Sequence, residues 1–357
     1  MTERTAPGPK TSAGNFFEDF RIGQELRHAT PRTLSTGDVA LYTALYGSRF
    51  ALTSSDDFAR AVGLHAAPVD DWLAFHIVFG KTVPDISLNA VANLGYAAGR
   101  FGLPVFPGDT LEARSTVIGL KENSSRKTGV VYVHTHGTNQ RGETVLDYVR
   151  WVMVNKRDAA APAPETVVPS LPEAVPAADL IVPADLDLRG YDVDLAGSAA
   201  LWEDYEAGER IDHVDGMTIE EAEHALATRL YQNTARVHFN QHTEAKGRFG
   251  RRLIYGGHII SLARALSFNG LANAFRIAAL NAGSHVAPVF AGDTIYAWSE
   301  VLAKLELPRR HDLGALRLRT IAAKNRPCAD FPYRDTAGAY DPAVVLDLDY
   351  TVLVKRR

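Results

Sequence analysis

The chain is built from two copies of one pattern, and this duplication constrains its fold more than any other feature. The segment FEDFRIGQEL near the start returns as WEDYEAGERI, so Glu18 corresponds to Glu203, 185 residues further along. Gly108 of FPGDTL and Gly292 of FAGDTI lie 184 residues apart, so the offset holds across most of each half. An offset this constant indicates an internal repeat, and we expect both halves to fold in the same way.

Both halves show the same order of expected elements. A helix is predicted over residues 36–47 and again over 219–232, because apolar residues recur there at helical spacing behind a polar start. An irregular segment and a second apolar helix follow in each half, and three strands end it. These strands are predicted at residues 109–121, 127–140, 143–156, 293–304, 314–325 and 343–355. One long helix against a strongly bent antiparallel sheet, made twice, is an α+β arrangement.

Composition divides the chain into four parts. Residues 1–15 lack the apolar run of a secretory signal and are expected to form a disordered arm. Residues 16–157 make up the first repeat and residues 188–357 the second. Between them, residues 158–187 are rich in Ala, Pro and Val, which favours an extended, semi-rigid linker over a folded unit.

Charge and cysteine content narrow the range of partners. A net charge of -4 argues against nucleic acid or an anionic membrane as the main partner. No apolar run approaches the roughly 18 residues that a membrane span needs. Cys328 is the single cysteine, so no internal disulfide can form, and we expect a cytoplasmic protein.

The segment from Tyr231 to Leu271 contains the residue types of a catalytic site. Asn233 and His238 lie on an irregular stretch, and the pair Gly256–Gly257 begins an apolar helix. A histidine can accept a proton from water near neutral pH. Amide groups at a helix start favour developing negative charge, and glycine lets a ligand approach them. Such parts suit an activated water beside a polarised carbonyl.

Structural readings of the same residues remain open at this point. His238 alone is more often a core histidine whose ring bonds a backbone carbonyl. Asn233 is also typical of a turn or a helix cap, and Gly256–Gly257 of close packing between helix and sheet. His238 and His242 mimic the spacing of a metal pair, but no third ligand is evident and no metal is expected.

Longer motifs carry a family resemblance. FARAVGLHAAPV with LPVFPGDTLEARSTV in the first half, and RVHFNQHTEAKGRFGRRLIYGGHI with APVFAGDTI in the second, resemble the MaoC-like, or hydratase-2-like, hot-dog proteins. The resemblance implies a double hot-dog fold, in which each sheet wraps a central helix and the two sheets join edge to edge. It also implies a CoA-thioester substrate bound between the halves. From about Phe16 onwards the chain most resembles the branch that reversibly hydrates mesaconyl-CoA (2-methylfumaryl-CoA) to β-methylmalyl-CoA, without metal or redox cofactor.

The resemblance also identifies the catalytic positions. The signature of the family is an Asp followed five residues later by a His, and this spacing falls on Asn233 and His238. In the first half the same positions hold Ser48 and Thr53. The resemblance therefore implies one active site for each chain, in the second half, with the first half shaping the substrate pocket. Asn233 departs from the family pattern, because a carboxamide cannot exchange a proton and can only orient the water.

Each residue of the expected site has a role in the hydration of an enoyl thioester. We expect His238 to act as the base for water, Asn233 to position that water and the Gly257 amide to polarise the thioester carbonyl. The proton donor stays open among His238 itself, His258 and Glu244. An Arg is expected to grip the free carboxylate of the substrate, and others to meet the CoA phosphates. The expected substrate contacts are Arg236, Arg248, Arg251, Arg252, Gly256 and His258.

Two other kinds of function are compatible with the sequence. One is a related enzyme, either an enoyl-CoA hydratase for another acyl group or a hot-dog thioesterase. The other is an acyl-CoA-binding protein without activity, which the missing Asp suggests. In each case we expect a homo-oligomer, because hot-dog sheets commonly pair.

Overall fold

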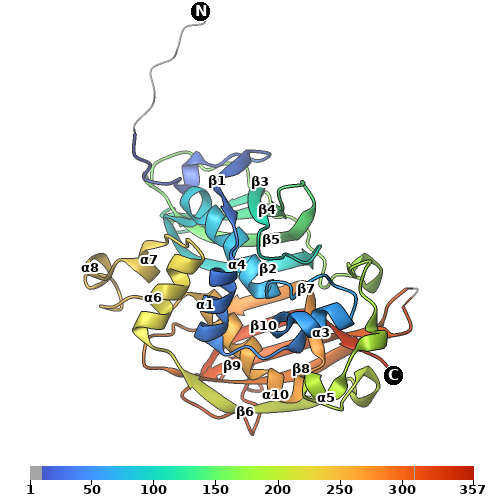
Figure 1. The fold of residues 1–357 in the computed structure, drawn as a ribbon. Coiled ribbons are helices and arrows are strands. Elements are labelled where there is room, and N and C mark those ends of the chain that lie inside the picture. Colours follow the sequence, from blue (N-terminus) through green and yellow to red (C-terminus); the bar gives the residue numbers. More distant parts are fainter. Residues whose placement is uncertain (1–9, 309) are drawn as a thin grey trace, which may run out of the picture.

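A computed structural model describes residues 10–308 and 310–357, and its strands form one antiparallel sheet of ten (Figure 1). The strands are β1 (Glu25–Thr33), β2 (Ala90–Phe101), β3 (Thr110–Glu122), β4 (Thr128–Thr138), β5 (Thr144–Asn155), β6 (Arg210–Thr218), β7 (Ala274–His285), β8 (Thr294–Glu306), β9 (Leu313–Lys324) and β10 (Val344–Lys355). Their order is β1-β3-β4-β5-β2-β7-β10-β9-β8-β6. The second half of that order mirrors the first, which confirms the predicted α+β double hot-dog arrangement.

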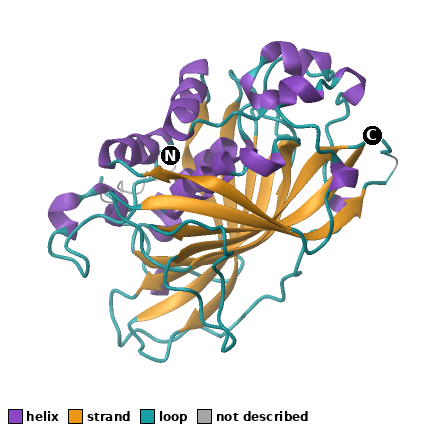
Figure 2. Cartoon of the chain, turned by 90° about the horizontal axis from the view of Figure 1, so that it is seen from below, coloured by secondary structure: helices purple, strands orange, loops and turns teal. Residues whose placement is uncertain are grey.

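The two half-sheets join through β2 and β7. These strands pair antiparallel, with Ala97 opposite Ala282. The two alanines are 185 residues apart, so equivalent positions of the two repeats face each other at the join. Figure 2 shows the strands fanning out as one curved sheet with most of the helices on one side. The edge-to-edge joining implied by the family resemblance is therefore present.

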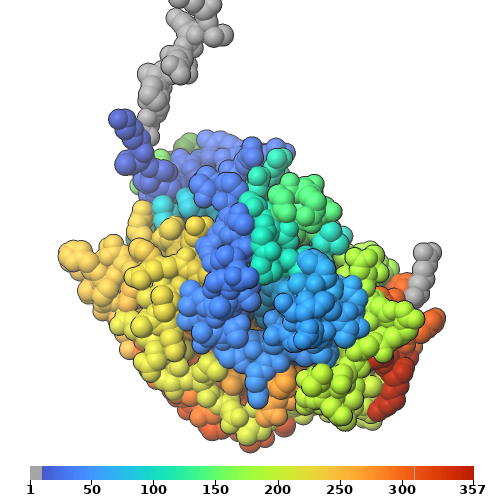
Figure 3. Space-filling view, in the orientation of Figure 1, coloured from blue at the N-terminus to red at the C-terminus, as the bar shows by residue number. Residues whose placement is uncertain are grey.

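The helices lie mainly within the curve of the sheet. They are α1 (Thr36–Tyr46), α2 (Ala51–Ser54), α3 (Asp56–Ala61), α4 (Asp71–Thr82), α5 (Val193–Ala196), α6 (Glu221–Leu230), α7 (Arg236–Phe239), α8 (Gln241–Glu244), α9 (Gly256–Leu266) and α10 (Phe268–Leu271). Short 3-10 turns occur at Phe17–Asp19, Ala177–Asp179, Leu188–Gly190 and Trp202–Asp204, and a π-helical turn at Val83–Ser87. Helices α4 and α9 are almost wholly buried, so they are the central helices of the two repeats. The predicted helices 36–47 and 219–232 are α1 and α6, which lie side by side (Figure 3).

Polar side chains connect the two repeats inside the core. The hydroxyl groups of Tyr46 and Tyr231 are 2.6 Å apart, and His76 Nε2 lies 2.9 Å from Ser261 Oγ. Both pairs are separated by 185 residues, so each joins equivalent positions across a local two-fold axis. Because buried polar groups are stable only when they are hydrogen-bonded, these contacts fix how one repeat sits on the other.

The connecting segment packs on the body of the protein. Val175 and Leu186 are buried, and the Val175 amide donates to the Asn281 side chain over 2.9 Å. Of the predicted arm 1–15, residues 1–9 lie outside the described residues. The neighbouring Ala13 carbonyl accepts a hydrogen bond from Asn89 over 2.9 Å. No helix among the described residues is long and apolar enough to cross a membrane.

Candidate active site

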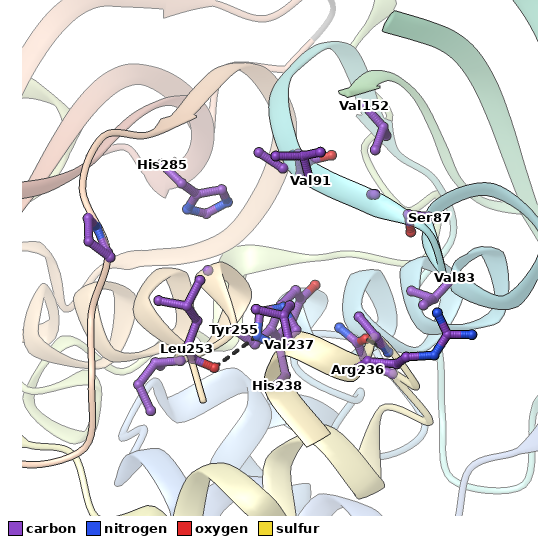
Figure 4. Close-up of a pocket in the computed structure, with 18 of the residues that line it drawn as sticks. Val83, Ser87, Val91, Val152, Arg236, Val237, His238, Leu253, Tyr255 and His285 are labelled. Atoms are coloured by element: carbon purple, nitrogen blue, oxygen red, sulfur yellow. Dashed lines mark hydrogen bonds between the residues drawn. The ribbon is translucent and has the colours of Figure 1, made fainter. Parts of the chain in front are cut away.

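A cavity of about 600 Å³ opens between the two repeats. The first repeat contributes the end of α4, the π-helical turn, β2 and β5. The second contributes the segment from Asn233 to Ile259 and the end of β7. Figure 4 shows this arrangement, with Val83, Ser87 and Val91 facing His238 and Leu253 across the space. A volume of this size fits a small-molecule site.

His238 lines the cavity from the short helix α7. Its Nδ1 lies 2.9 Å from the Leu253 carbonyl oxygen, which can only accept a hydrogen bond. Nδ1 therefore carries the proton and Nε2 keeps a free lone pair (Figure 4). Burial of the ring lowers the pKa of His238 to about 4, although the Leu253 carbonyl opposes the shift. The imidazole is thus neutral at physiological pH and oriented as an acceptor.

Asn233 is 2% exposed and also lines the cavity. Its backbone N–H donates to the Thr228 carbonyl over 2.9 Å, and its side-chain Oδ1 accepts a hydrogen bond from the Ala235 backbone N–H over 3.1 Å. The second bond makes the local turn that the residue type allows. The turn reading of Asn233 is therefore present in the structure, and it holds the side chain at the cavity wall five residues before His238.

The loop that carries Asn233 is held by a helix of the other repeat. At Gly80, on α4, a Cβ atom would lie 1.9 Å from the Tyr231 carbonyl oxygen. Only glycine allows the helix to approach the backbone this closely. The first repeat therefore positions the loop of the second that carries Asn233.

Gly256 and Gly257 begin helix α9 beneath aromatic rings. A Cβ at Gly256 would meet the His285 ring at 2.3 Å, and one at Gly257 would meet the Tyr255 ring at 2.3 Å. Gly256 therefore packs closely on β7, as the packing of helix on sheet would require, whereas Gly257 packs against Tyr255 and His76 of α4. Gly256 lines the cavity, whereas Gly257 lies just behind it. Within the described part of the chain neither amide has a hydrogen-bond acceptor, so neither is used by the protein itself.

The structure contradicts the expected role of His258. This side chain is 1% exposed and is absent from the cavity wall. Its Nδ1 lies 2.8 Å from the Tyr46 hydroxyl, and burial lowers its pKa to about 3. One residue after Gly257 the helix has turned its side chain towards the core. The structure therefore places His258 in the core and does not support it as a substrate contact or proton donor, whereas Glu244 does line the cavity.

The predicted arginines divide into two pairs. Arg236 and Arg248 are exposed residues at the cavity, and Arg236 Nη1 donates to Asn89 Oδ1 over 3.0 Å. Arg251 and Arg252 are not in the cavity wall, so the structure does not support their predicted substrate contacts. The Arg251 guanidinium packs 3.8 Å from the centre of the Phe290 ring, and Arg252 pairs with Glu221 over 2.6 Å.

Sequence reasoning missed several cavity residues. His285, the last residue of β7, lines the cavity, and its Nε2 lies 3.3 Å from the Tyr96 hydroxyl. Burial lowers the pKa of His285 to about 4. Arg150 lies at the wall with its side chain fully buried. The sequence could have indicated Arg150, because it is a charged residue within the apolar strand YVRWVMV and burial of an unpaired charge is costly. Nowhere in the described chain do three His, Cys, Asp or Glu residues gather as a metal site would require.

The equivalent site of the first repeat is closed. Ser48 and Thr53 line a space of about 10 Å³, which is too small for an acyl group. Beside it the Arg264 side chain packs 3.6 Å from the centre of the Phe50 ring and donates to the Ala274 carbonyl. Of the two equivalent positions, the one with the histidine is the one with a cavity.

Comparison with solved structures places the fold. A Mycobacterium tuberculosis protein described as having a double hotdog fold matches with a TM-score of 0.74 at 25% identity, over 96% of this chain and 99% of that one. The crystal structure of a MaoC domain protein dehydratase from Chloroflexus aurantiacus matches with a TM-score of 0.96 at 70% identity, over 98% of this chain and 100% of that one. Fold and site therefore define a double hot-dog protein of the MaoC-like class.

Within that class the chain belongs to the mesaconyl-CoA hydratase family, whose model matches residues 4–337. The β-methylmalyl-CoA dehydratase of Chloroflexus aurantiacus is 70% identical over 348 residues, which are 98% of this chain and 99% of that protein. The mesaconyl-CoA hydratase of Cereibacter sphaeroides is 63% identical over 347 residues, which are 97% of this chain and 100% of that protein.

Proposed function

We propose that this protein catalyses the reversible addition of water to mesaconyl-CoA, which gives β-methylmalyl-CoA. One observation carries the proposal: a neutral histidine with a free Nε2 lines the same cavity as a helix start with unpaired amides. The names of the relatives from Cereibacter sphaeroides and Chloroflexus aurantiacus describe the forward and reverse directions of this reaction. Addition of water is redox-neutral, so the proposed chemistry transfers no electrons to a cofactor.

The first step forms the new carbon–oxygen bond. His238 Nε2 takes a proton from a water molecule that Asn233 orients, and the hydroxyl oxygen bonds to the β-carbon of the enoyl group. The electrons of the double bond move towards the thioester oxygen. In this proposal the amides of Gly256 and Gly257 stabilise the resulting negative charge, because they are preorganised at the helix start.

The second step restores the thioester. The α-carbon takes up one proton, and the enolate electrons return to form the carbon–hydrogen bond. Burial lowers the pKa of His238 to about 4, so its protonated ring is a stronger acid than an ordinary imidazolium, and we assign this transfer to the same residue. This assignment explains how a site with Asn233 in place of a carboxylate can still complete the reaction.

A spectroscopic assay tests the proposal. We expect mesaconyl-CoA to lose its enoyl-thioester absorbance without release of free thiol. His238→Ala is expected to lower kcat by at least about 10²-fold, the usual contribution of a positioned base. His242→Ala is the matched control, since His242 is exposed, lies four residues away and does not line the cavity.

The other outcomes are distinct. Unchanged turnover in His238→Ala rules out this residue as the base. Release of free thiol by the wild type identifies a thioesterase. Absence of turnover with retained binding of CoA esters identifies a binding protein.

A further inference from the structure

The Arg150 side chain is the charged group that the fold accounts for least. It is 0% exposed on β5, and its Nη2 donates to Thr82 Oγ1 over 2.7 Å. The Nε and Nη1 atoms are buried and have no hydrogen-bond partner among the described residues. No carboxylate in the described chain forms an ion pair with this guanidinium. These two donors are left for an acceptor that the described chain does not supply.

The repeat shows that the sheet itself does not require this arginine. Arg150 is the seventh residue of β5, and Tyr350 is the seventh residue of β10, the equivalent strand. The two-fold relation that brings Arg150 of the first repeat to the open site of the second puts buried Tyr350, of the second repeat, on the side of the closed site of the first. The same strand position therefore carries a neutral ring where no cavity exists and a cation where one does.

A row of two aromatic rings connects Arg150 with His238. Its guanidinium packs 4.3 Å from the centre of the Phe79 ring, and the ring centres of Phe79 and Tyr255 are 5.6 Å apart. The Tyr255 and His238 ring centres are 5.5 Å apart. Arg150, Tyr255 and His238 all line the cavity, and Arg236 and Arg248 line it with side chains that are exposed to solvent.

We propose that Arg150 binds the free carboxylate of the acyl group and so selects CoA esters of dicarboxylic acids. The inference rests on the proposed function for the identity of the acyl group. In mesaconyl-CoA the free carboxylate is attached to the β-carbon, the atom that receives the hydroxyl group. A guanidinium that holds this carboxylate with two N–H groups places the β-carbon beside His238. The exposed arginines then remain for the phosphates of CoA.

The test uses two ligands that differ only at this group and that the enzyme does not convert. Methylsuccinyl-CoA carries the carboxylate, and 2-methylbutyryl-CoA carries a methyl group in its place. We expect calorimetry to show tighter binding of methylsuccinyl-CoA to the wild type. In Arg150→Met its affinity should fall by about 30-fold or more, as for loss of one partner of a buried charge pair. Affinity for 2-methylbutyryl-CoA should change less than about threefold, since it makes no such contact.

Two further variants keep the test decisive. Arg150→Lys retains the charge and is expected to recover part of the preference for methylsuccinyl-CoA, which also covers the case in which Arg150→Met does not fold. Arg248→Met should weaken both ligands by the same factor. Equal affinity of the wild type for the two ligands, or an unchanged preference in folded Arg150→Met, overturns the inference. Because binding needs no turnover, these results are separate from a failure of the wild type to hydrate mesaconyl-CoA.

Discussion

Replacement of Gly80 by alanine tests whether the first repeat positions the catalytic loop of the second. An added Cβ would lie 1.9 Å from the Tyr231 carbonyl oxygen, whereas ordinary contact begins at 3.4 Å. Helix and loop must therefore separate by about 1.5 Å, an overpacking that commonly destabilises by ~1–3 kcal/mol. Alanine gains ~1 kcal/mol of helix propensity, so the net loss of unfolding free energy should be at most about 2 kcal/mol.

The displaced loop carries Asn233 and ends near His238, so activity should fall further than stability. A misplacement of about 1 Å in a catalytic group can reduce the rate by ~10²-fold, and we expect a decrease of this order in kcat. Urea unfolding and initial rates with mesaconyl-CoA measure the two effects.

Gly37→Ala is the matched control for Gly80→Ala. Gly37 also lies in a helix, but its added Cβ would meet only Ser35 Oγ at 3.4 Å. We expect unchanged kcat and equal or slightly greater stability in this variant. If Gly80→Ala behaves like Gly37→Ala in both measurements, the close approach of α4 does not position the loop.

Two other predictions follow from the buried polar groups. Burial lowers the pKa of His238 to about 4, so the base is unprotonated above that pH. We therefore expect kcat/KM to stay level from pH 8 down to about pH 5 and to fall below it. A fall centred at the ordinary histidine pKa of about 6.5 would show that the ring is not desolvated. Tyr46→Phe removes the bonds to the Tyr231 hydroxyl and to His258 Nδ1, and leaving these buried groups unpaired should lower the unfolding free energy by ~1–3 kcal/mol in urea. Tyr132→Phe is its control, because the half-buried Tyr132 side chain has no hydrogen-bond partner among the described residues, and this variant should stay within about 0.5 kcal/mol of the wild type.

The sequence by itself determined the duplication, the class of fold and the position of the candidate base. The constant offset and the alternation of apolar residues are properties of the chain order, so they can be read without coordinates. The predicted strands 143–156 and 343–355 became β5 and β10 within two residues at each end. The spacing of Asn233 and His238, together with Ser48 and Thr53 in the other repeat, distinguished the open site from the closed one.

Only the tertiary structure decided which charged and titratable side chains meet at that site. His258 is one residue from Gly257 in the sequence, yet the turn of α9 directs its ring into the core. Arg150 is 88 residues before His238 in the chain and reaches the same cavity because α4 and β5 of one repeat pack against the loop of the other. The pairing of β2 with β7 and the packing of α4 on Tyr231 set that arrangement. Both depend on contacts between residues distant in sequence, which no local pattern encodes.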